Sequence, residues 1–280
     1  MRWMIVADSS CYLAIKGLQV PEETGFATVP LSVLVGDREF IDNEELDVQE
    51  QRQALAAHQG KTSSACPAPE LWAEKFRQAD YSVAVTMTSA LSGTYNSALI
   101  GKEMVLEKFP DKKIHVIDTR STAGHMVVLC KKISRLIGEG LDFDEVCRQA
   151  DICNKETCLL FTLQSYETLV KNGRMNRFVG MVATKMNIRA VGKATEAGEL
   201  GMITKERGET RAFRALVKQM AKMKAMEDLD VYIHHCMNKQ GADMVAKLVE
   251  EHYPTCRPHI LPCRGLTSYY AENGGILAGF

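Results

Sequence analysis

Two short segments rich in hydroxyl side chains are the first candidates for chemistry in this chain. Lys61–Ser64 reads Lys-Thr-Ser-Ser, and Ser89–Thr94 reads Ser-Ala-Leu-Ser-Gly-Thr. The second segment follows an apolar run and leads into a stretch with helical spacing. Gly93 would let the backbone approach a ligand, and the first amides of the helix carry partial positive charge. We therefore expect an acid head group, either a carboxylate or a phosphate, to bind between the two segments.

Both segments also have a simpler interpretation. Ser92 or Thr94 could merely cap the helix that follows, which is the usual task of such residues. Lys61–Ser64 could likewise cap a helix predicted at Glu70–Ala79. The residues of these segments alone do not decide between capping and binding.

Two further polar turns follow predicted strands. Asp8-Ser9-Ser10 comes after the first strand, and Asp118-Thr119-Arg120-Ser121 comes after a later one. In open α/β sheets, ligands bind beyond the carboxyl ends of the strands, so Asp8 and Ser9 join the candidate site. Asp8, Asp42 and Asp118 could instead act as acid–base groups, but loop carboxylates more often fix turns.

The first half of the chain alternates short β-rich runs with helical stretches. The predicted strands are Trp3–Ala7, Val29–Val35, Arg38–Ile41, Ser82–Met87 and Ile114–Asp118. The predicted helices are Glu44–His58 with Asn43 as its cap, Glu70–Ala79, Thr94–Phe109, Thr122–Ile137 and Phe143–Asn154. Strands separated by helices of this length indicate a mostly parallel, doubly wound α/β sheet.

In the second half, strands come as hairpins beside helices. The predicted strands are Cys158–Thr162, Ile188–Ala194, Leu200–Thr204, Asp230–His235, His259–Pro262 and Ile276–Phe280. The predicted helices are Ser165–Lys171, Asn176–Lys185, Arg211–Met226 and Lys239–His252. This pattern is typical of an α+β arrangement. We expect two domains, residues 1–155 and 156–280, with a boundary near Asn154–Cys158.

Composition excludes several classes of function. Lys and Arg total 34 against 35 Asp and Glu, so no excess charge favours a nucleic-acid partner. Nine dispersed cysteines without a C-x-x-C pair fit a reducing compartment. The chain shows neither a signal-peptide pattern nor an apolar run of about 20 residues. We therefore expect a cytoplasmic protein with no integral membrane segment.

Cofactor and metal motifs are also missing. The chain has no G-x-x-x-x-G-K-[ST], no G-x-G-x-x-G and no G-x-S-x-G. His234-His235-Cys236 has further His and Cys residues downstream, but their spacing matches no standard metal site. The sequence therefore predicts neither a nucleotide cofactor nor a metal.

A set of motifs runs in order along nearly the whole chain. They are Ile5–Cys11 ("DSSCDL"), Val29-Pro30-Leu31 with Asp42 ("VPL…D"), Lys61-Thr62-Ser63 with Pro67 and Pro69 ("TSQPSP"), Ser89–Ala98 ("SS-x-LSGTYQSA"), Val116–Thr119 ("VIDS"), Leu169–Arg174 ("L-x-x-GGR", with Asn172 for the first glycine), Asn187–Ala190 ("LNIKPI") and Lys205–Gly208 ("K-x-RG"). In these motifs the chain resembles the DegV family of fatty-acid-binding proteins. The Ser89–Ala98 match is the most specific of them.

The resemblance implies a two-domain α/β protein with a long-chain fatty acid in a tunnel between the domains. The family positions that hold the carboxylate are Thr62 and Ser92 here, with Ser63, Gly93 and Thr94 beside them. Some members carry acyl groups for a fatty-acid kinase whose own subunit supplies the ATP chemistry. The resemblance thus predicts a lipid carrier without intrinsic catalysis.

Two arginines and two methionines extend this expectation. Arg174 and Arg207 match family arginines and would face the kinase partner, although arginines that are solvated or fix a loop are an equal alternative. Met181 and Met186 would offer a flexible lining to the fatty-acid tail.

One departure concerns the end of the chain. The family usually carries "H-T-G-P-G" there, and its histidine lies near the head group. Alignment of the closing glycines places Ala271 at the histidine position, followed by Glu272. The loss of this donor weakens the case for acyl-phosphate handling, and Glu272 could oppose a carboxylate. The phenolic hydroxyl of Tyr269 or Tyr270 could replace the missing donor.

Two alternative functions stay open at this point. Ser92 could be the nucleophile of an acyl-ester hydrolase, which would need a histidine base within reach. The candidate bases are His58, His115, His125 and His235. The start of the helix at Ser92–Thr94 could instead bind a small phosphorylated metabolite.

Overall fold

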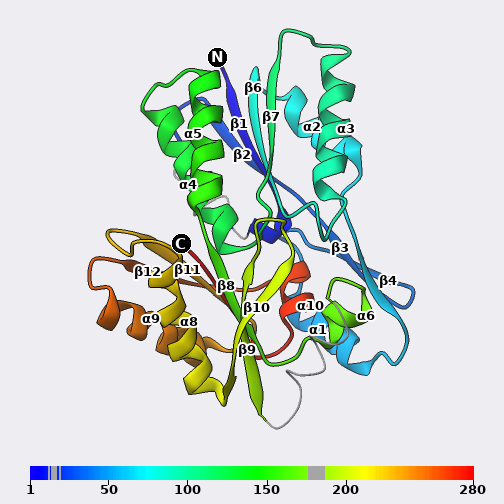
Figure 1. Ribbon diagram of the computed structural model, residues 1–280. Coiled ribbons are helices and arrows are strands. Elements are labelled where there is room, and N and C mark those ends of the chain that lie inside the picture. The colour runs from blue at the N-terminus through cyan, green and yellow to red at the C-terminus, as the bar shows by residue number, and fades with distance from the viewer. Residues whose placement is uncertain (12, 14–17, 19, 176–186) are drawn as a thin grey trace.

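A parallel sheet forms the centre of the first half of the chain. The computed structural model describes residues 1–11, 13, 18, 20–175 and 187–280 (Figure 1). In spatial order the strands are β2 (Thr24–Val29), β1 (Trp3–Asp8), β6 (Tyr81–Thr86) and β7 (Lys113–Asp118), and every neighbouring pair is parallel. The predicted parallel α/β sheet is confirmed.

Helices cover both faces of this sheet because its strands are apolar on both faces. Ile5 and Ala7 of β1 pack in one cluster with α4, whereas Met4 and Val6 pack in another with α2 and α3. The helices are α2 (Pro69–Arg77), α3 (Thr94–Leu106), α4 (Gly124–Gly138) and α5 (Phe143–Glu156). Figure 1 shows α4 and α5 on one side of the sheet and α2 and α3 on the other.

A six-stranded mixed sheet forms the second half of the described chain. Its order is β10 (Leu200–Arg207), β9 (Ile188–Ala194), β8 (Leu159–Leu163), β13 (Ile276–Gly279), β11 (Asp230–His235) and β12 (Arg257–Pro262). Helices α8 (Glu209–Met223) and α9 (Lys239–His252) cover one face, while α6 (Glu167–Lys171) and α10 (Gly265–Ala271) lie on the other. This agrees with the predicted α+β pattern.

A small antiparallel sheet joins the two halves. Its strands are β4 (Arg38–Ile41), β3 (Ser32–Val35) and β5 (Thr62–Ala65), and α1 (Val48–Ala57) lies between β4 and β5 in the chain. Both β3 and α1 pack against α10, far along the sequence. The division at residue 155 therefore remains a prediction, because this early segment lies beside late helices.

Helix α4 makes a second connection between the halves. A Cβ atom on Gly124 would lie 2.7 Å from the carbonyl oxygen of Tyr232 and 2.8 Å from the amide nitrogen of Gly279. Only glycine allows the start of α4 to lie this close to β11 and β13.

None of the described helices combines the length and the apolar character that a membrane span requires.

Two local predictions are wrong, and a third concerns residues that the structure does not describe. Val29–Val35 is not one strand, because Pro30 has no N–H to donate and the chain passes from β2 to β3 there. Asn43 does not cap α1: the carboxylate of Asp47 accepts the amides of Gln49 and Glu50 at 2.8 and 3.1 Å. The predicted helix Asn176–Lys185, with Met181 and Met186, lies outside the described residues.

Candidate functional site

Lys61–Ser64 is not a loop, as its sequence suggested, but lies mostly in strand β5. Strand β5 pairs with β3 in antiparallel register, so successive side chains point to opposite faces. Thr62 and Ser64 are half-buried, whereas Ser63 is exposed. The hydroxyl of Thr62 lies 2.7 Å from that of Tyr269, and the hydroxyl of Ser64 lies 2.8 Å from that of Tyr270. The first hydroxyl segment thus faces two tyrosines of α10.

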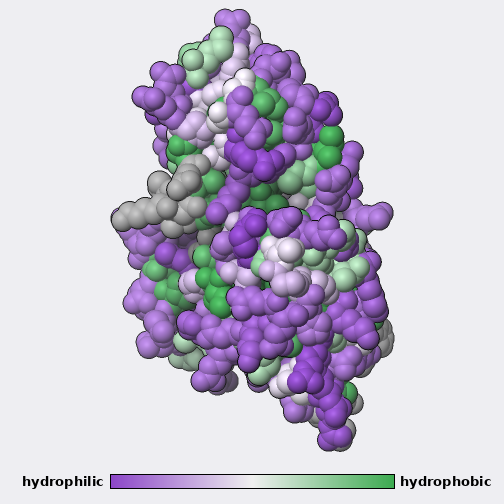
Figure 2. Space-filling model, turned by 90° about the vertical axis from the view of Figure 1, so that its left-hand side faces the viewer, coloured by the Kyte–Doolittle hydropathy of each residue, from purple (hydrophilic) through white to green (hydrophobic). Residues whose placement is uncertain are grey.

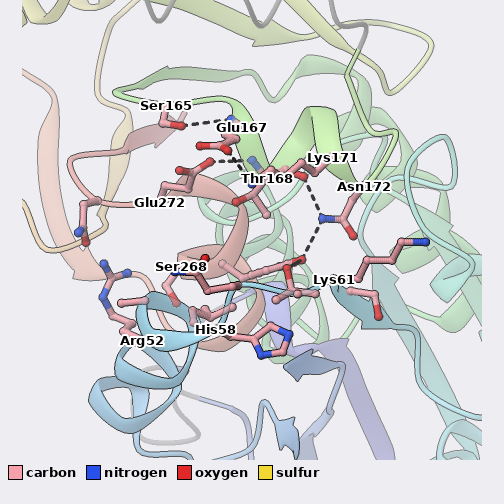
Figure 3. A pocket seen from close by; sticks show the side chains of 18 of the residues that line it. Arg52, His58, Lys61, Ser165, Glu167, Thr168, Lys171, Asn172, Ser268 and Glu272 are labelled. Carbon is pink, nitrogen blue, oxygen red and sulfur yellow. Dashed lines mark hydrogen bonds and ion pairs between the residues drawn. The ribbon is translucent and has the colours of Figure 1, made fainter. Parts of the chain in front are cut away.

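Tyr269 also has a partner from a third element. Its hydroxyl oxygen accepts a hydrogen bond of 2.9 Å from the side-chain amide of Asn172, just after α6. The same amide nitrogen donates to the carbonyl oxygen of Thr168 at 2.9 Å. Figure 3 shows Asn172 beside α6, with dashed lines leaving its side-chain nitrogen in two directions. The sequence comparison raised Tyr269 as a donor, but nothing in the residue pattern indicated Asn172.

Ser92 lies at the start of α3 but does not occupy the capping position. The cap residue is Gly93, which offers no side-chain hydrogen bond to the helix. The Ser92 and Thr94 hydroxyls lie 2.8 Å apart, and the Ser92 oxygen is 3.4 Å from the Thr94 amide nitrogen. Capping by Ser92 is therefore weak at best. This leaves the positive end of a 13-residue helix beside a paired hydroxyl group.

The two hydroxyl segments meet through neighbouring residues. A Cβ atom on Gly93 would lie 3.2 Å from the sulfur of Cys66, which follows β5, so this turn lies against the end of the strand. Arg174 donates to the carbonyl oxygens of Leu91 at 3.2 Å and Asn172 at 2.6 Å. The guanidinium thus links the Ser92 turn to the Asn172 turn. Its predicted role toward a kinase stays a prediction.

Arg207 lies elsewhere. It ends strand β10, is exposed, and lines neither of the cavities described below. Its predicted contact with a partner is compatible with this exposure but has no support from the site.

An apolar pocket of about 90 Å³ lies between the halves of the chain. We call it the apolar pocket, and its lining residues are Met87, Leu91, Thr122, Leu159, Phe161, Leu163, Leu169, Arg174, Leu200, Leu266, Thr267, Tyr270, Ala271 and Leu277. Alternate residues of β8 (Leu159, Phe161 and Leu163) face it, whereas Leu160 faces α8 and α9. Figure 2 shows hydrophobic residues across the middle of one face of the molecule.

A polar cleft of about 1160 Å³ opens on the other side of α10 (Figure 3). Its lining residues are Arg52, Leu55, Ala56, His58, Gln59, Gly60, Lys61, Thr62, Ser63, Gln164, Ser165, Glu167, Thr168, Lys171, Asn172, Ser268, Tyr269, Glu272 and Asn273. Lys171 pairs with Glu167 at 2.6 Å. The Glu272 carboxylate, which could have opposed an acid ligand, accepts the amide of Thr168 at 2.9 Å.

Asp8 and Ser9 line neither cavity. Asp8 is fully buried and accepts bonds from the amide and hydroxyl of Ser10 and from the amide of Met87. Burial raises its pKa to about 6, although these bonds oppose the shift. The hydroxyl of Ser9 accepts the amide of Leu31 at 3.0 Å. Both side chains fasten strand ends, and their ligand contact remains a prediction.

The other carboxylates also fix turns. Asp118 accepts the amide of Ser89 at 3.1 Å and its hydroxyl at 2.5 Å, so the hydroxyl hydrogen of Ser89 is already used within this turn. Asp42 accepts the amide of Leu266 at 2.9 Å at the start of α10. The negative charge of Asp42 also contributes to the raised pKa of Asp8.

The histidines considered as bases have other surroundings. His115 lies 3.0 Å from Asp151, and His125 lies 2.8 Å from Asn154. Burial lowers the pKa of His125 to about 4, so it is neutral at pH 7. His58 packs against Gly36 and Gly60. In the described part of the chain, the Ser92 hydroxyl bonds to the hydroxyl of Thr94 rather than to one of these histidines, which does not support a nucleophile and base.

Within the described ranges, no three or more His, Cys, Asp or Glu side chains are grouped as metal ligands would be. The downstream histidine His259, for example, lies 2.7 Å from Asp230 and stacks on Tyr232.

Comparison with known proteins gives a consistent result. A family model described as "Uncharacterised protein, DegV family" matches residues 2–278. A DegV domain-containing protein of Streptococcus gordonii is 37% identical over 281 residues, which cover 100% of this chain and 99% of that protein.

Solved structures extend the similarity to the whole fold. The Streptococcus pneumoniae fatty acid kinase (Fak) B3 protein loaded with linoleic acid is 36% identical, with a TM-score of 0.95 over 100% of this chain and 99% of that one. A DegV family protein from Eubacterium eligens loaded with heptadecanoic acid is 32% identical, with a TM-score of 0.92 over 99% and 98%. The chain belongs to the DegV family.

Proposed function

We propose that this protein binds a long-chain fatty acid in the cytoplasm and presents its carboxylate to a fatty-acid kinase. The tail would enter the apolar pocket between the two domains, residues 1–155 and 156–280, which would have to widen around it, because a long acyl chain needs several times the pocket's 90 Å³. The carboxylate would lie against the hydroxyls of Thr62 and Ser92, where Arg174 of the apolar pocket bonds to Asn172 of the polar cleft. The observation that carries this proposal is the apolar pocket, whose lining residues Leu91 and Tyr270 directly adjoin Ser92 and Tyr269 in the chain.

The two surfaces match the two parts of a fatty acid. Burying roughly 15 methylenes at about 0.8 kcal/mol each offers on the order of 12 kcal/mol before the costs of association. The tail therefore dominates the affinity, and the head group needs only to keep its hydrogen bonds. Hydroxyls and the amides at the start of α3 can meet that need and still release the acid to a partner.

Support for a carrier comes from two sources. The Streptococcus pneumoniae protein of the same fold is named as part of a fatty acid kinase and holds linoleic acid. In this chain the hydroxyl of Ser92 is paired with Thr94, and the candidate bases have other surroundings. We propose a carrier without turnover of its own, with Arg174 on the side that meets the kinase. All nine cysteines are free thiols, as in a reducing compartment.

Native mass spectrometry of the purified protein tests fatty-acid binding. We expect a bound mass of one C16 or C18 acid, or its appearance after addition of palmitate or oleate. Thr62→Val combined with Ser92→Ala should lower palmitate affinity by about tenfold or more, because two hydrogen bonds to a charged group are lost. Ser89→Ala is the matched control, since that hydroxyl donates to Asp118. Protein that stays empty with both acids would overturn the proposal.

The kinase step needs a separate assay. With ATP and the catalytic subunit of a fatty-acid kinase, the loaded protein should yield acyl phosphate, whereas the loaded protein with ATP alone should not. Acyl phosphate formed without the catalytic subunit would contradict the carrier assignment.

A further inference from the structure

Three side chains from separate elements form a hydrogen-bonded chain at the head-group end of the site. Asn172 follows α6, Tyr269 belongs to α10, and Thr62 begins β5. The Asn172 amide nitrogen is 2.9 Å from the Tyr269 oxygen, which is 2.7 Å from the Thr62 oxygen. Tyr269 is 3% exposed, so these bonds form away from bulk water. Bonds in such surroundings polarise one another and are strengthened in sequence.

Counting the available hydrogens shows which group donates in each of these hydrogen bonds. The carbonyl oxygen of Thr168 can only accept, so the atom of Asn172 that contacts it must be the NH₂ group. That group donates one hydrogen to Thr168 and the other to Tyr269. The orientation of the Asn172 amide is therefore fixed by chemistry, and the Tyr269 oxygen is held as an acceptor.

The remaining hydrogens leave one donor free. Tyr269 and Thr62 have two hydroxyl hydrogens, and the bond between them uses one. Because Asn172 already donates to Tyr269, the favoured arrangement has Tyr269 donate to Thr62. The hydrogen of Thr62 is then left to donate outward at the wall of the polar cleft. A ligand oxygen with negative charge is the strongest acceptor for it.

We infer that Asn172 and Tyr269 are positioning residues that make Thr62 a hydrogen-bond donor to the carboxylate of the bound fatty acid. This inference rests on the proposed function. It makes the head-group site selective for an ionised acid over a neutral ester with the same tail, since a charge-assisted bond is roughly twice as strong as a neutral one.

The experiment compares palmitate with methyl palmitate in calorimetric titrations of delipidated protein at pH 8. Tyr269→Phe removes the hydroxyl and keeps the ring. We expect it to lower the ratio of acid to ester affinity about tenfold, equivalent to about 1.4 kcal/mol. Tyr270→Phe is the matched control, because that neighbouring hydroxyl contacts Ser64 on the same strand. Any change that it causes should be the same for both ligands, so the ratio of their affinities should stay at the wild-type value.

A second pair of variants tests whether Tyr269 acts through Thr62. In a Thr62→Val background, Tyr269→Phe should cause no further loss of the affinity ratio. Asn172→Asp should also lower the ratio of acid to ester affinity. The new carboxylate would accept the Tyr269 hydrogen, so Thr62 would donate to Tyr269 and not to the ligand. Both affinities are measured on the same preparation of each variant. An unfolded fraction would lower both by the same factor and leave their ratio unchanged.

The outcomes separate the two proposals. If the wild type binds neither ligand, the proposed function fails and this inference fails with it. If the wild type prefers palmitate and Tyr269→Phe keeps that preference, the inference is overturned while the proposed function stands. If Tyr269→Phe and Thr62→Val act additively, Tyr269 contacts the ligand independently and its positioning role is refuted.

Discussion

Thr267 provides a sharp test of how polar groups are treated in the apolar pocket. It is 6% exposed, lines the pocket, and its hydroxyl oxygen has no hydrogen-bond partner among the described residues. A buried hydroxyl without a partner costs about 1–3 kcal/mol. Thr267→Val replaces the hydroxyl by a methyl of similar size, so no cavity is left. We expect the free energy of unfolding to rise by about 1 kcal/mol, or the Tm by about 2 °C.

Urea unfolding of the delipidated protein measures this effect. Thr119→Val is the matched control: Thr119 is 2% exposed, but its hydroxyl donates to the carbonyl oxygen of Thr86 at 2.8 Å. That substitution should lower the free energy of unfolding by about 1–3 kcal/mol, because it removes the bond to Thr86 and also the bond of 3.2 Å that the hydroxyl accepts from the amide of Ser121. Destabilisation of Thr267→Val by a similar amount would show that its hydroxyl is satisfied and would refute the reasoning.

Three further predictions concern the fold and the site. Asp8 has a pKa of about 6 in the folded protein against 3.8, so the folded state holds its proton more tightly. The free energy of unfolding should fall by about 3 kcal/mol as pH rises from about 3 to about 7, and Asp8→Asn should remove this part in pH-dependent urea unfolding. Gly101→Ala should lower the free energy of unfolding by about 1–3 kcal/mol despite its gain in helix propensity, because the new Cβ would lie 2.7 Å from a carbonyl oxygen of α2. The control Gly138→Ala, at the end of α4, should be close to neutral in the same assay. Arg174→Ala should lower palmitate affinity about tenfold, because it removes the bond to Leu91 that holds the Ser92 turn. Arg207→Ala is the control, and an equal loss of affinity in that variant would contradict this account.

Elements with their own local signal were predicted closely. Strand β9, strand β11 and helix α9 have the bounds expected from the sequence, because apolar alternation or a capping residue marks each one. In α9, for example, the side chain of Asn238 accepts the amide of Gly241 at 3.0 Å. Signals of this kind depend only on neighbouring residues, so one sequence contains them.

Three elements lack such a signal and were missed. Strand β5 reads Thr-Ser-Ser-Ala and is held by its pairing with β3 rather than by apolar alternation. Helix α10 begins with glycine and contains Thr267 and two tyrosines, which are weak helix formers; Asp42, far away in the chain, accepts an amide in its first turn. Strand β2 includes Gly25, which is a poor strand former. Only its last residue, Val29, was predicted, as the start of a strand that continued past Pro30.

The candidate site was predictable in part for the same reason. The residues of the motifs and their order indicated Thr62 and Ser92. The contact between Thr62 and Tyr269, however, spans 207 positions in the chain. Asn172 registered only as a departure from a glycine, because its role depends on a tyrosine from another element. Contacts across such separations are set by the packing of β5, α6 and α10, which the spacing of residues does not encode.

The geometry of α10 gives Ala271 a different meaning from the one its sequence position suggested. Residues four apart share a face of a helix, and Thr267 and Ala271 both line the apolar pocket, as do Leu266 and Tyr270. Tyr269 lines the polar cleft on the other side. A longer side chain at 271 would therefore enter the space proposed for the tail, whereas the tyrosine hydroxyl at 269 already reaches Thr62. Alanine at this position leaves that space free, and Tyr269 contacts the proposed head-group donor, Thr62, from the other face of the same helix.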